Sequence, residues 1–459
     1  MSKVELEYKP KSGWQVYASA KDRKEMNALA GRYLDFLSRN KTEREVMTCV
    51  RGKLEQAGFS ENLTSPRCFR FSRGKTVFMA RKGKQPLSKG FRLVGAHADA
   101  PRIDLKQRPL YEDTGLALAK THYYGGIRKY QWLTIPLALH GVIVRKDGSM
   151  VEVCIGEDVS DPVLTITDLL PHLAYKEVEK KLADAFDAEK LNIVLAHEPE
   201  LPGGKSDKEP KVKPRLLKLL HERYGVAEAD LFSAELQIVP AGPARSVGLD
   251  ASLVGSYAQD DRACVYTALE AFLDQEEEPE HCQIVLFWDK EEIGSEGSTG
   301  AKSLFFEYCM EELAEAWEPG ARLSHIFMAG QAISADVAAA VDPDFQEVYE
   351  KNNAAYLGYG PCFNKFTGHR GKVGANDAHP EFIGRLRAVL DNAGVPWQMA
   401  ELGKVDMGGG GTVAKFLAVY GMDIIDMGPP VLSMHSPFEI SSKVDIFATV
   451  NAYRAFLAS

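Results

Sequence analysis

The chain has 459 residues, of which 45% are hydrophobic and 26% charged, a composition typical of soluble globular proteins with two or more domains. The formal net charge of −9 argues against a general nucleic-acid binder, because such proteins carry a basic surface that neutralises phosphates. The seven cysteines are scattered and form no CxxC pair, which argues against a disulfide framework or a zinc knuckle and favours a cytoplasmic location.

The N-terminal part of the chain predicts helices followed by strands. Helical periodicity covers residues 21–58 and breaks near Asn40 and Gly58, so we expect two amphipathic helices. Strand-like runs follow at 75–81 and 91–99. The second run is apolar enough to lie at the centre of a sheet.

The middle and the end of the chain differ in their predicted secondary structure. Between residues 103 and 246 strands and turns dominate, with one helix expected near 174–188. Farther along, strands at 281–289 and 323–330 alternate with helices predicted at 261–275, 301–317, 379–394 and 412–420. This alternation predicts an α/β sheet with helices on both faces. We therefore expect a three-layer α/β/α catalytic domain built from residues 1–102 and 247–459, with a strand-rich domain at 103–246 inserted into it.

Histidine and acidic side chains follow several of the predicted strands. His97 and Asp99 stand two residues apart at a strand end, so both point to the same side. Asp260 and Asp261 precede a helix, where an N-cap and a first-turn carboxylate are the ordinary explanation. Taken alone, each pair is more often explained by structure than by function.

A second carboxylate pair, Glu291 and Glu292, follows the strand at 281–289, although like charges so close together repel each other. Neighbouring positions diverge in direction, so one carboxylate can bind a metal while the other faces the water on that metal. Asp336 and His435 also lie behind apolar segments.

Together these side chains form one set of imidazoles and hard oxygens. In α/β sheets, ligands gather beyond the carboxyl ends of the strands. The donor atoms suit zinc, manganese or cobalt. Two metals about 3.5–4 Å apart need a bridging carboxylate and a base near the shared water. The set therefore favours a two-metal hydrolytic site at the edge of the sheet.

Five motifs occur in order along the chain: GAHADAPRID, QDDRA, DKEEIGS, SADVAAAVDP and LSMHSPFE. Their order and wording resemble the aspartyl aminopeptidase family of cocatalytic zinc metallopeptidases. Further similarity, in YYGGI, LLPHLA, AELQIVPAGPA and DMGPPVLSMHS, extends the resemblance over nearly the whole chain. The resemblance implies an enzyme that removes N-terminal Asp or Glu from peptides with a free N-terminus. It also implies two zinc ions per subunit, for which manganese or cobalt can substitute.

The resemblance implies a role for each metal-binding residue. It makes Asp260 the carboxylate that bridges the two metals. His97 and Asp336 would bind one metal, and Glu292 and His435 would bind the other.

Three further residues receive roles in the reaction from the same resemblance. Glu291 becomes the general base, which explains the adjacent carboxylates. Asp99 resembles the carboxylate that orients the imidazole and supports the base. His172, in LLPHLA, is implied to reach the active site of a neighbouring subunit in a homododecamer built from dimers, with residues 103–246 making the dimer contacts.

Four residues are candidates for contact with the substrate. Among the basic residues of the segment 363–372, Lys365 is the first choice for the cation that recognises an acidic side chain. Gly409 and Gly410, ahead of a predicted helix, could present N–H groups to a substrate carboxylate or oxyanion. Met434 is the fourth candidate for contact with the substrate. The glycine run lacks the GK[ST] ending of a phosphate loop, which argues against nucleotide binding.

Alternatives to an acid-specific aminopeptidase stay open. SADVAAAVDP has Ala338 to Ala340 where the family often has a histidine, and this departure puts the acidic specificity in doubt. A zinc aminopeptidase of broader specificity or a related amidohydrolase would share the same order of ligands. A shell-forming protein without turnover is a different class of function, against which the intact Glu291 argues.

Overall fold

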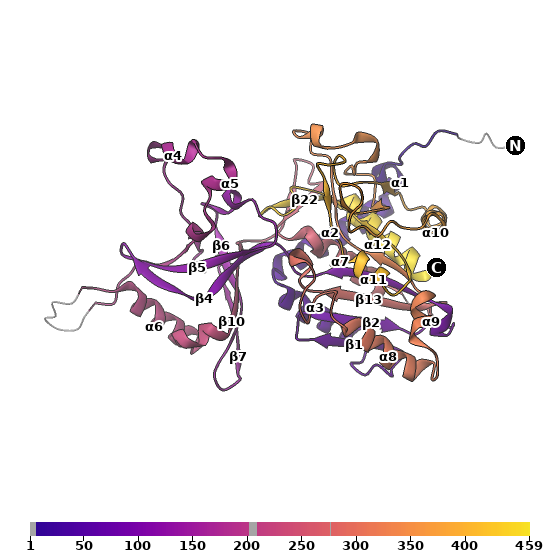
Figure 1. Cartoon of the computed structure of the whole chain (residues 1–459), viewed down its shortest axis with the longest axis horizontal. Helices are drawn as coiled ribbons and strands as arrows, with labels where there is room; N and C mark the ends of the chain where they lie inside the picture. The colour runs from indigo at the N-terminus through magenta and orange to yellow at the C-terminus, as the bar shows by residue number, and fades with distance from the viewer. Residues whose placement is uncertain (1–5, 202–208, 276) are drawn as a thin grey trace. The chain divides into compact units, whose positions relative to one another are not determined.

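In the computed structural model, which describes residues 6–201, 209–275 and 277–459, the chain divides into two compact units (Figure 1). The first unit comprises the described residues up to Ala100, together with Ala244–Met434 and Glu439–Ser459. The second comprises Pro101–Pro243 and the short segment His435–Phe438. The inserted unit therefore starts two residues before the predicted position 103 and ends three before 246. His435–Phe438, which the sequence places in the second catalytic part at 247–459, is grouped with the inserted unit.

An eight-stranded sheet forms the centre of the first unit, in the order β1-β2-β13-β3-β14-β20-β16-β18. Its four middle strands are parallel: β13 (Cys282–Trp288), β3 (Phe91–His97), β14 (Gln331–Ser334) and β20 (Asp423–Gly428). The flanking strands are β1 (Arg67–Ser72), β2 (Thr76–Arg81), β16 (Cys362–Asn364) and β18 (Gln398–Met399). Of these, β2 and β16 run antiparallel to their middle-strand neighbours.

Two hydrophobic cores cover the two faces of this sheet, because neighbouring side chains of a strand point to opposite faces. On β13, Val285 and Phe287 belong to one core, whereas Ile284 and Leu286 belong to the other. The helices of the first core are α2 (Ala20–Arg39), α3 (Glu43–Gln56), α7 (Gln259–Leu273), α10 (Pro380–Asn392) and α12 (Lys443–Ala458). Those of the second are α8 (Phe305–Trp317), α9 (Leu323–Met328) and α11 (Ala414–Ala418). The unit thus has the predicted α/β/α layers.

The strand predicted at 323–330 was wrong, because most of that segment is helix α9. Leu323, Ile326 and Phe327 fall at helical spacing, and all three pack into the second core. The strand, β14, begins only at Gln331, after the turn at Gly330. A short apolar run does not by itself distinguish a strand from one turn of buried helix.

The first unit also contains a five-stranded sheet, in the order β11-β12-β22-β21-β15. Its strands are β11 (Arg245–Val247), β12 (Leu253–Ser256), β22 (Glu439–Ser442), β21 (Pro430–Leu432) and β15 (Ala338–Ala339). The central strand β22 pairs with both β12 and β21, so this sheet joins the segment before α7 to the segment that follows β20.

The second unit is built on a seven-stranded antiparallel sheet, in the order β7-β6-β10-β4-β5-β9-β8. Its strands are β4 (Arg102–Asp113), β5 (Leu116–Tyr124), β6 (Leu137–Val144), β7 (Met150–Ile155), β8 (Thr165–Ile166), β9 (Ile193–Ala196) and β10 (Ala234–Pro240). The helix expected near 174–188 is instead two short helices, α4 (Tyr175–Val178) and α5 (Leu182–Ala185). A longer helix, α6 (Val212–Tyr224), follows.

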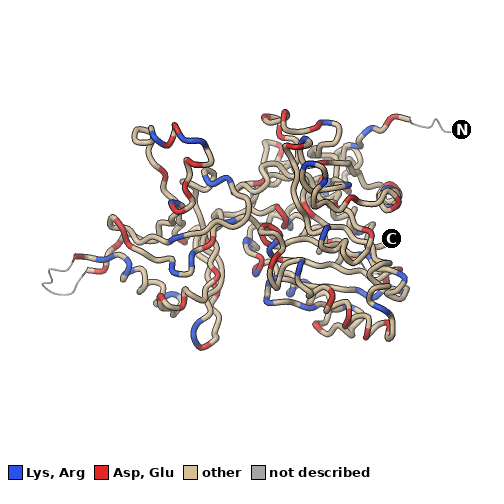
Figure 2. Tube along the Cα trace, in the orientation of Figure 1, with Lys and Arg blue, Asp and Glu red and all other residues tan. Residues whose placement is uncertain are grey.

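Among the described residues, acidic and basic residues are interspersed over both units (Figure 2). Among the helices of the described residues, none has the length and apolar character needed to cross a membrane.

Strand register brings the carboxyl ends of the middle strands to one edge. Trp288, the last residue of β13, pairs with His97, the last residue of β3. Ser334, the last residue of β14, pairs with Gly95 on one side and Asp426 on the other. The segments that leave β3, β13 and β14 therefore start beside one another.

A buried charged network holds the end of β13. The Asp289 carboxylate accepts hydrogen bonds from Thr299 Oγ1 and Lys290 Nζ, each at 2.8 Å. Lys75 Nζ lies 2.9 Å from Glu43 Oε1 and 3.8 Å from Asp289 Oδ2. Burial and the nearby Glu43 carboxylate raise the pKa of Asp289. The Lys75 ammonium therefore offsets two carboxylates that have little access to water.

We predict that Lys75→Met lowers the free energy of unfolding by about 3 kcal/mol, because removal of one partner leaves buried charge uncompensated. Urea unfolding followed by tryptophan fluorescence measures this change. Lys21→Met is the matched control, since the Lys21–Glu25 pair is exposed and such pairs contribute less than about 1 kcal/mol. Equal effects of the two substitutions would contradict a stabilising role for the buried network.

Candidate active site

His97 stands at the end of β3 with both ring nitrogens engaged. Its Nδ1 lies 3.1 Å from the backbone carbonyl of Asp99. Its Nε2 lies 3.1 Å from Asp260 Oδ1 and 3.9 Å from Asp336 Oδ1. When Nδ1 carries the proton and donates it to the carbonyl, the Nε2 lone pair faces the two carboxylates and is available to a metal.

Asp99 connects the end of β3 with the segment after β13. Its side chain is fully buried. Oδ1 accepts the backbone N–H of Glu291 at 3.1 Å, and Oδ2 accepts that of Glu292 at 3.2 Å. Both glutamates lie in the short helical turn Glu291–Ile293, between Lys290 and Gly294, which have left-handed backbone conformations. The turn and Asp99 together fix the backbone from which each glutamate side chain extends.

Asp260 and Asp261 lie at the start of α7, where the backbone is not yet helical and their peptide bond is cis. The backbone N–H of Asp260 donates to Glu439 Oε2 at 3.0 Å. Asp261 Oδ1 accepts from Cys264 N at 3.3 Å, as an N-terminal carboxylate of a helix does. Asp261 Oδ2 is buried and has no hydrogen-bond partner among the described residues.

The electrostatics of the group reflect crowded negative charge. Burial raises the pKa of Asp336 well above its usual value, and the neighbouring Asp260 raises it further. Burial also raises the pKa of Asp261. For His97, burial opposes protonation, but hydrogen bonds to Asp260 and Asp99 outweigh it and raise the pKa. A cation among these groups would relieve the repulsion between the carboxylates.

Two groups of donor atoms in this cluster fit a metal ion. The first consists of His97, Asp261 and Asp336, and the second of His97, Asp260 and Glu292. Within each group, the donor atoms lie within 4.8 Å of one another. Imidazole nitrogen and carboxylate oxygen are the donors that zinc accepts at catalytic sites. The residues of the first unit therefore fit the predicted metal chemistry.

Two of the predicted site residues, His435 and His172, belong to the second unit. His435 Nδ1 lies 2.8 Å from the carbonyl oxygen of Gly126. His172 is exposed in the turn Pro171–Leu173.

The residues predicted to bind substrate lie in the first unit. Lys365 Nζ pairs with Asp377, so its charge is partly offset. Gly409 and Gly410 form the short strand β19, which pairs with β17 (Gly368–His369). Met434 is partly buried against the first core.

Sequence reasoning missed two contributions to the cluster. Asp261 was explained only as part of the helix start, yet its carboxylate lies within the first group of donor atoms. Glu439 is not among the residues predicted for the site, yet its side chain accepts the backbone N–H of Asp260. Glu439 lies on β22, which pairs with the β12 strand that leads to α7. This pairing brings Glu439 to Asp260, and no local sequence pattern indicates it.

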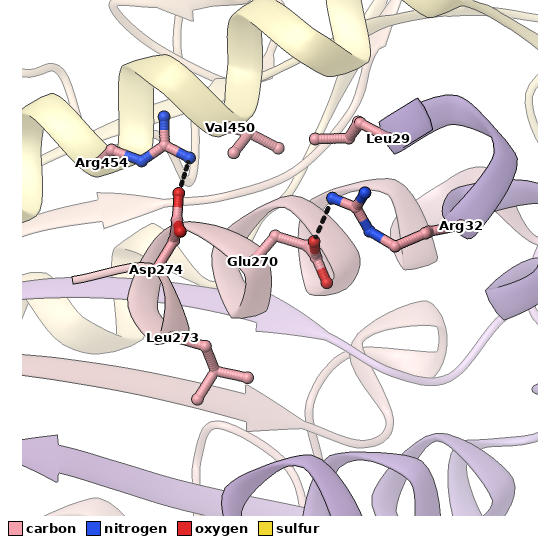
Figure 3. A pocket seen from close by; sticks show the side chains of 7 residues that line it. All are labelled: Leu29, Arg32, Glu270, Leu273, Asp274, Val450 and Arg454. Carbon is pink, nitrogen blue, oxygen red and sulfur yellow. Dashed lines mark hydrogen bonds and ion pairs between the residues drawn. The ribbon is translucent and has the colours of Figure 1, made fainter. Parts of the chain in front are cut away.

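A separate pocket lies among helices α2, α7 and α12 (Figure 3). Glu270 pairs with Arg32 at 3.0 Å and with Lys53 at 2.8 Å, and Arg454 pairs with Asp274. Glu270 follows Asp261, the last non-helical residue at the start of α7, by nine positions, or about 14 Å along the helix axis. The pocket is therefore distinct from the cluster around His97. Its lining residues are Leu29, Arg32, Glu270, Leu273, Asp274, Val450 and Arg454.

Comparison with known proteins agrees with this chemistry. The sequence model of the M18 family, described as aminopeptidase I zinc metalloprotease, matches residues 36–457. A curated M18 family aminopeptidase 1 from Clostridium acetobutylicum is 48% identical over 459 aligned residues, which cover 97% of this chain and 98% of the relative.

Solved structures of M18 aminopeptidases have the same fold as this chain. An M18 aminopeptidase from Thermotoga maritima superposes with a TM-score of 0.92 at 44% identity, covering 98% of this chain and 99% of that one. Aminopeptidase I from Clostridium acetobutylicum superposes with a TM-score of 0.92 at 46% identity, covering 99% and 100%. The chain therefore belongs to the M18 family of zinc metallo-aminopeptidases.

Proposed function

We propose that this metallo-aminopeptidase hydrolyses the peptide bond after a free N-terminal residue, with Glu291 as general base at a site for two metal ions. The observation that carries the proposal is the set of contacts made by Asp99. Its carboxylate receives the N–H groups of Glu291 and Glu292, while its carbonyl engages His97. The proposed base and two of the proposed ligands are thereby held by one residue.

The proposed ligand set follows the family resemblance. Asp260 would hold both ions, His97 and Asp336 would hold one of them, and Glu292 and His435 would hold the other. Support comes from the distances of His97 Nε2 to Asp260 and Asp336, and from the group formed by His97, Asp260 and Glu292. Zinc is the proposed ion at both positions, with manganese or cobalt as substitutes.

A bound zinc pair supplies a water of lowered pKa and polarises the scissile carbonyl. In the proposed reaction the Glu291 carboxylate accepts a proton from the attacking water. Glu291 then returns that proton to the amine of the leaving peptide, so one residue acts as base and then as acid. Asp99 keeps the backbone of Glu291 in place during both transfers.

The proposed substrates are peptides with N-terminal Asp or Glu. Lys365 is the cation proposed to recognise the acidic side chain, and the N–H groups of Gly409 and Gly410 are proposed to bind a substrate oxygen. Met434 is proposed to contact the substrate as well. The pairing of β17 with β19 supports a shared role, because it joins the segment after Lys365 to the glycine segment.

We also propose a homo-oligomer built from dimers, with a dodecamer as the full assembly. The second unit supports this, because apolar side chains around His172 are 43–82% exposed. Large exposed apolar patches mark interaction surfaces. A second copy of the chain is proposed to cover them and to receive His172 in its active site. The apolar side chains are Leu169, Leu170, Leu173, Tyr175, Val178 and Leu182.

Glu291→Gln tests the general base. We expect kcat to fall roughly 10²–10⁴-fold, because the amide cannot accept the proton from water. Metal content, measured by atomic emission, should stay at the parent level. Glu296→Gln is the matched control, since Glu296 is an exposed glutamate of the same loop that pairs with Lys302. Loss of metal together with activity would instead identify Glu291 as a ligand.

A substrate panel tests the class of reaction. Dipeptides with N-terminal Asp, Glu, Leu, Ala or Lys are offered free and N-acetylated, after chelation and re-addition of zinc, manganese or cobalt. We expect no cleavage by the chelated protein and cleavage of free-amine substrates alone after metal is restored, with Asp and Glu preferred. Cleavage of acetylated substrates would favour an amidohydrolase. Inactivity with every metal would favour a non-catalytic shell protein.

Mixing inactive subunits tests whether His172 acts in a neighbouring active site. His172→Ala and Glu291→Gln should each be nearly inactive alone. After dissociation and reassembly in equal amounts, about a quarter of the parent activity should return, because half of the dimers are mixed and each has one complete site. No recovery in assemblies shown to be mixed would mean that His172 acts within its own subunit or not at all.

A further inference from the structure

The loop that carries Lys365 is closed at its base by Asp377 and its neighbours. We call residues 365–377 the basic loop. Ala378 N donates to the carbonyl of Lys365 at 2.7 Å, which joins the two ends of the loop. The Asn376 side-chain amide donates to the carbonyl of Ile424 at 2.7 Å and ties the loop to β20. These bonds fix Asp377 opposite Lys365.

Asp377 is shared between two lysines of the basic loop. Lys365 Nζ donates to Asp377 Oδ1, and Lys372 Nζ donates to Oδ2 at 2.9 Å. The three side chains are 38–46% exposed, so solvent and a ligand can reach them. One carboxylate against two ammonium groups leaves a local charge of about +1, so a second anion is attracted less strongly than by two unpaired lysines.

The basic loop is also joined to the glycine segment. Gly368 pairs with Gly410, and His369 pairs with Gly409. The strands approach so closely that a Cβ atom on Gly409 would stand 2.2 Å from the carbonyl oxygen of Gly368. The two segments proposed to contact substrate therefore form one surface, and the ion pair of Lys365 lies in the loop that forms part of it.

We propose that Asp377 is a specificity-determining residue, which competes with an acidic substrate side chain for Lys365 and thereby weakens the preference for N-terminal Asp and Glu. The inference rests on the proposed function, in which Lys365 recognises the substrate. A substrate carboxylate must share the Lys365 ammonium with Asp377 or displace it. Sharing places two carboxylates side by side, and displacement breaks an existing ion pair. An uncharged N-terminal residue binds without sharing Lys365 and without displacing Asp377.

The charge state of Asp377 supports this competition. Hydrogen bonds from Lys365 and then Lys372 lower the pKa of Asp377. The carboxylate therefore stays ionised throughout the neutral pH range, in which it acts as a permanent competitor.

Asp377→Asn tests the proposal by removing the competing charge with little change in size. We expect the ratio of kcat/KM for Asp-Ala to kcat/KM for Leu-Ala to rise roughly fivefold, the change that about 1 kcal/mol produces. Asp35→Asn is the matched control. It removes one negative charge from another exposed ion pair, that of Asp35 with Arg39 on α2, and should leave the ratio unchanged.

A double-mutant cycle identifies Lys365 as the contested partner. Lys365→Met should lower the ratio, and adding Asp377→Asn to Lys365→Met should no longer raise it. Thermal unfolding of each variant provides a separate measure of folding.

The outcomes separate this inference from the proposed function. A parent enzyme that cleaves peptides, together with an unchanged ratio in Asp377→Asn, would overturn the inference and leave the proposed function standing. An equal loss on both substrates would overturn it too, because Asp377 would then only brace the loop. A parent inactive on every substrate and metal would overturn both.

Discussion

The geometry of the candidate site depends on Asp99 more than on any other residue. Its two carboxylate oxygens accept successive backbone N–H groups from the turn after β13, and its own carbonyl orients the His97 ring. Hydrogen bonds between a charged acceptor and backbone donors are roughly twice as strong as neutral ones. Because Asp99 is fully buried, water does not compete for them. One side chain thus sets the distance between two strand ends.

Much of this arrangement could be predicted from the sequence, because it follows from strand periodicity. The side chains of His97 and Asp99 point to the same side because they are two residues apart. The parallel strands bring the segments that follow them to one edge of the sheet. The division of the strand residues between two cores follows the same alternation. The motif order then identified the family, which the comparisons confirmed.

The remaining features depend on contacts between segments that are distant in sequence. The apolar run at 323–328 is helical because Ile326 and Phe327 reach a core that local patterns do not reveal. Glu439 reaches Asp260 only because β22 pairs with β12. Asp377 lies twelve positions after Lys365, and no periodicity brings them together. Sequence patterns specify which way a side chain points within its own strand or helix. Contacts between distant segments depend instead on how the whole unit is folded.

The two-sided burial of β13 has a consequence for how the family can change over time. Single substitutions on this strand affect one core or the other, and a residue of similar volume can replace the original. A one-residue insertion or deletion would instead turn every following side chain to the opposite face. It would also displace Asp289 from Thr299 and the N–H groups of Glu291 and Glu292 from Asp99. A change in the length of β13 would therefore disturb both cores and the candidate site at once, whereas a substitution would disturb one core.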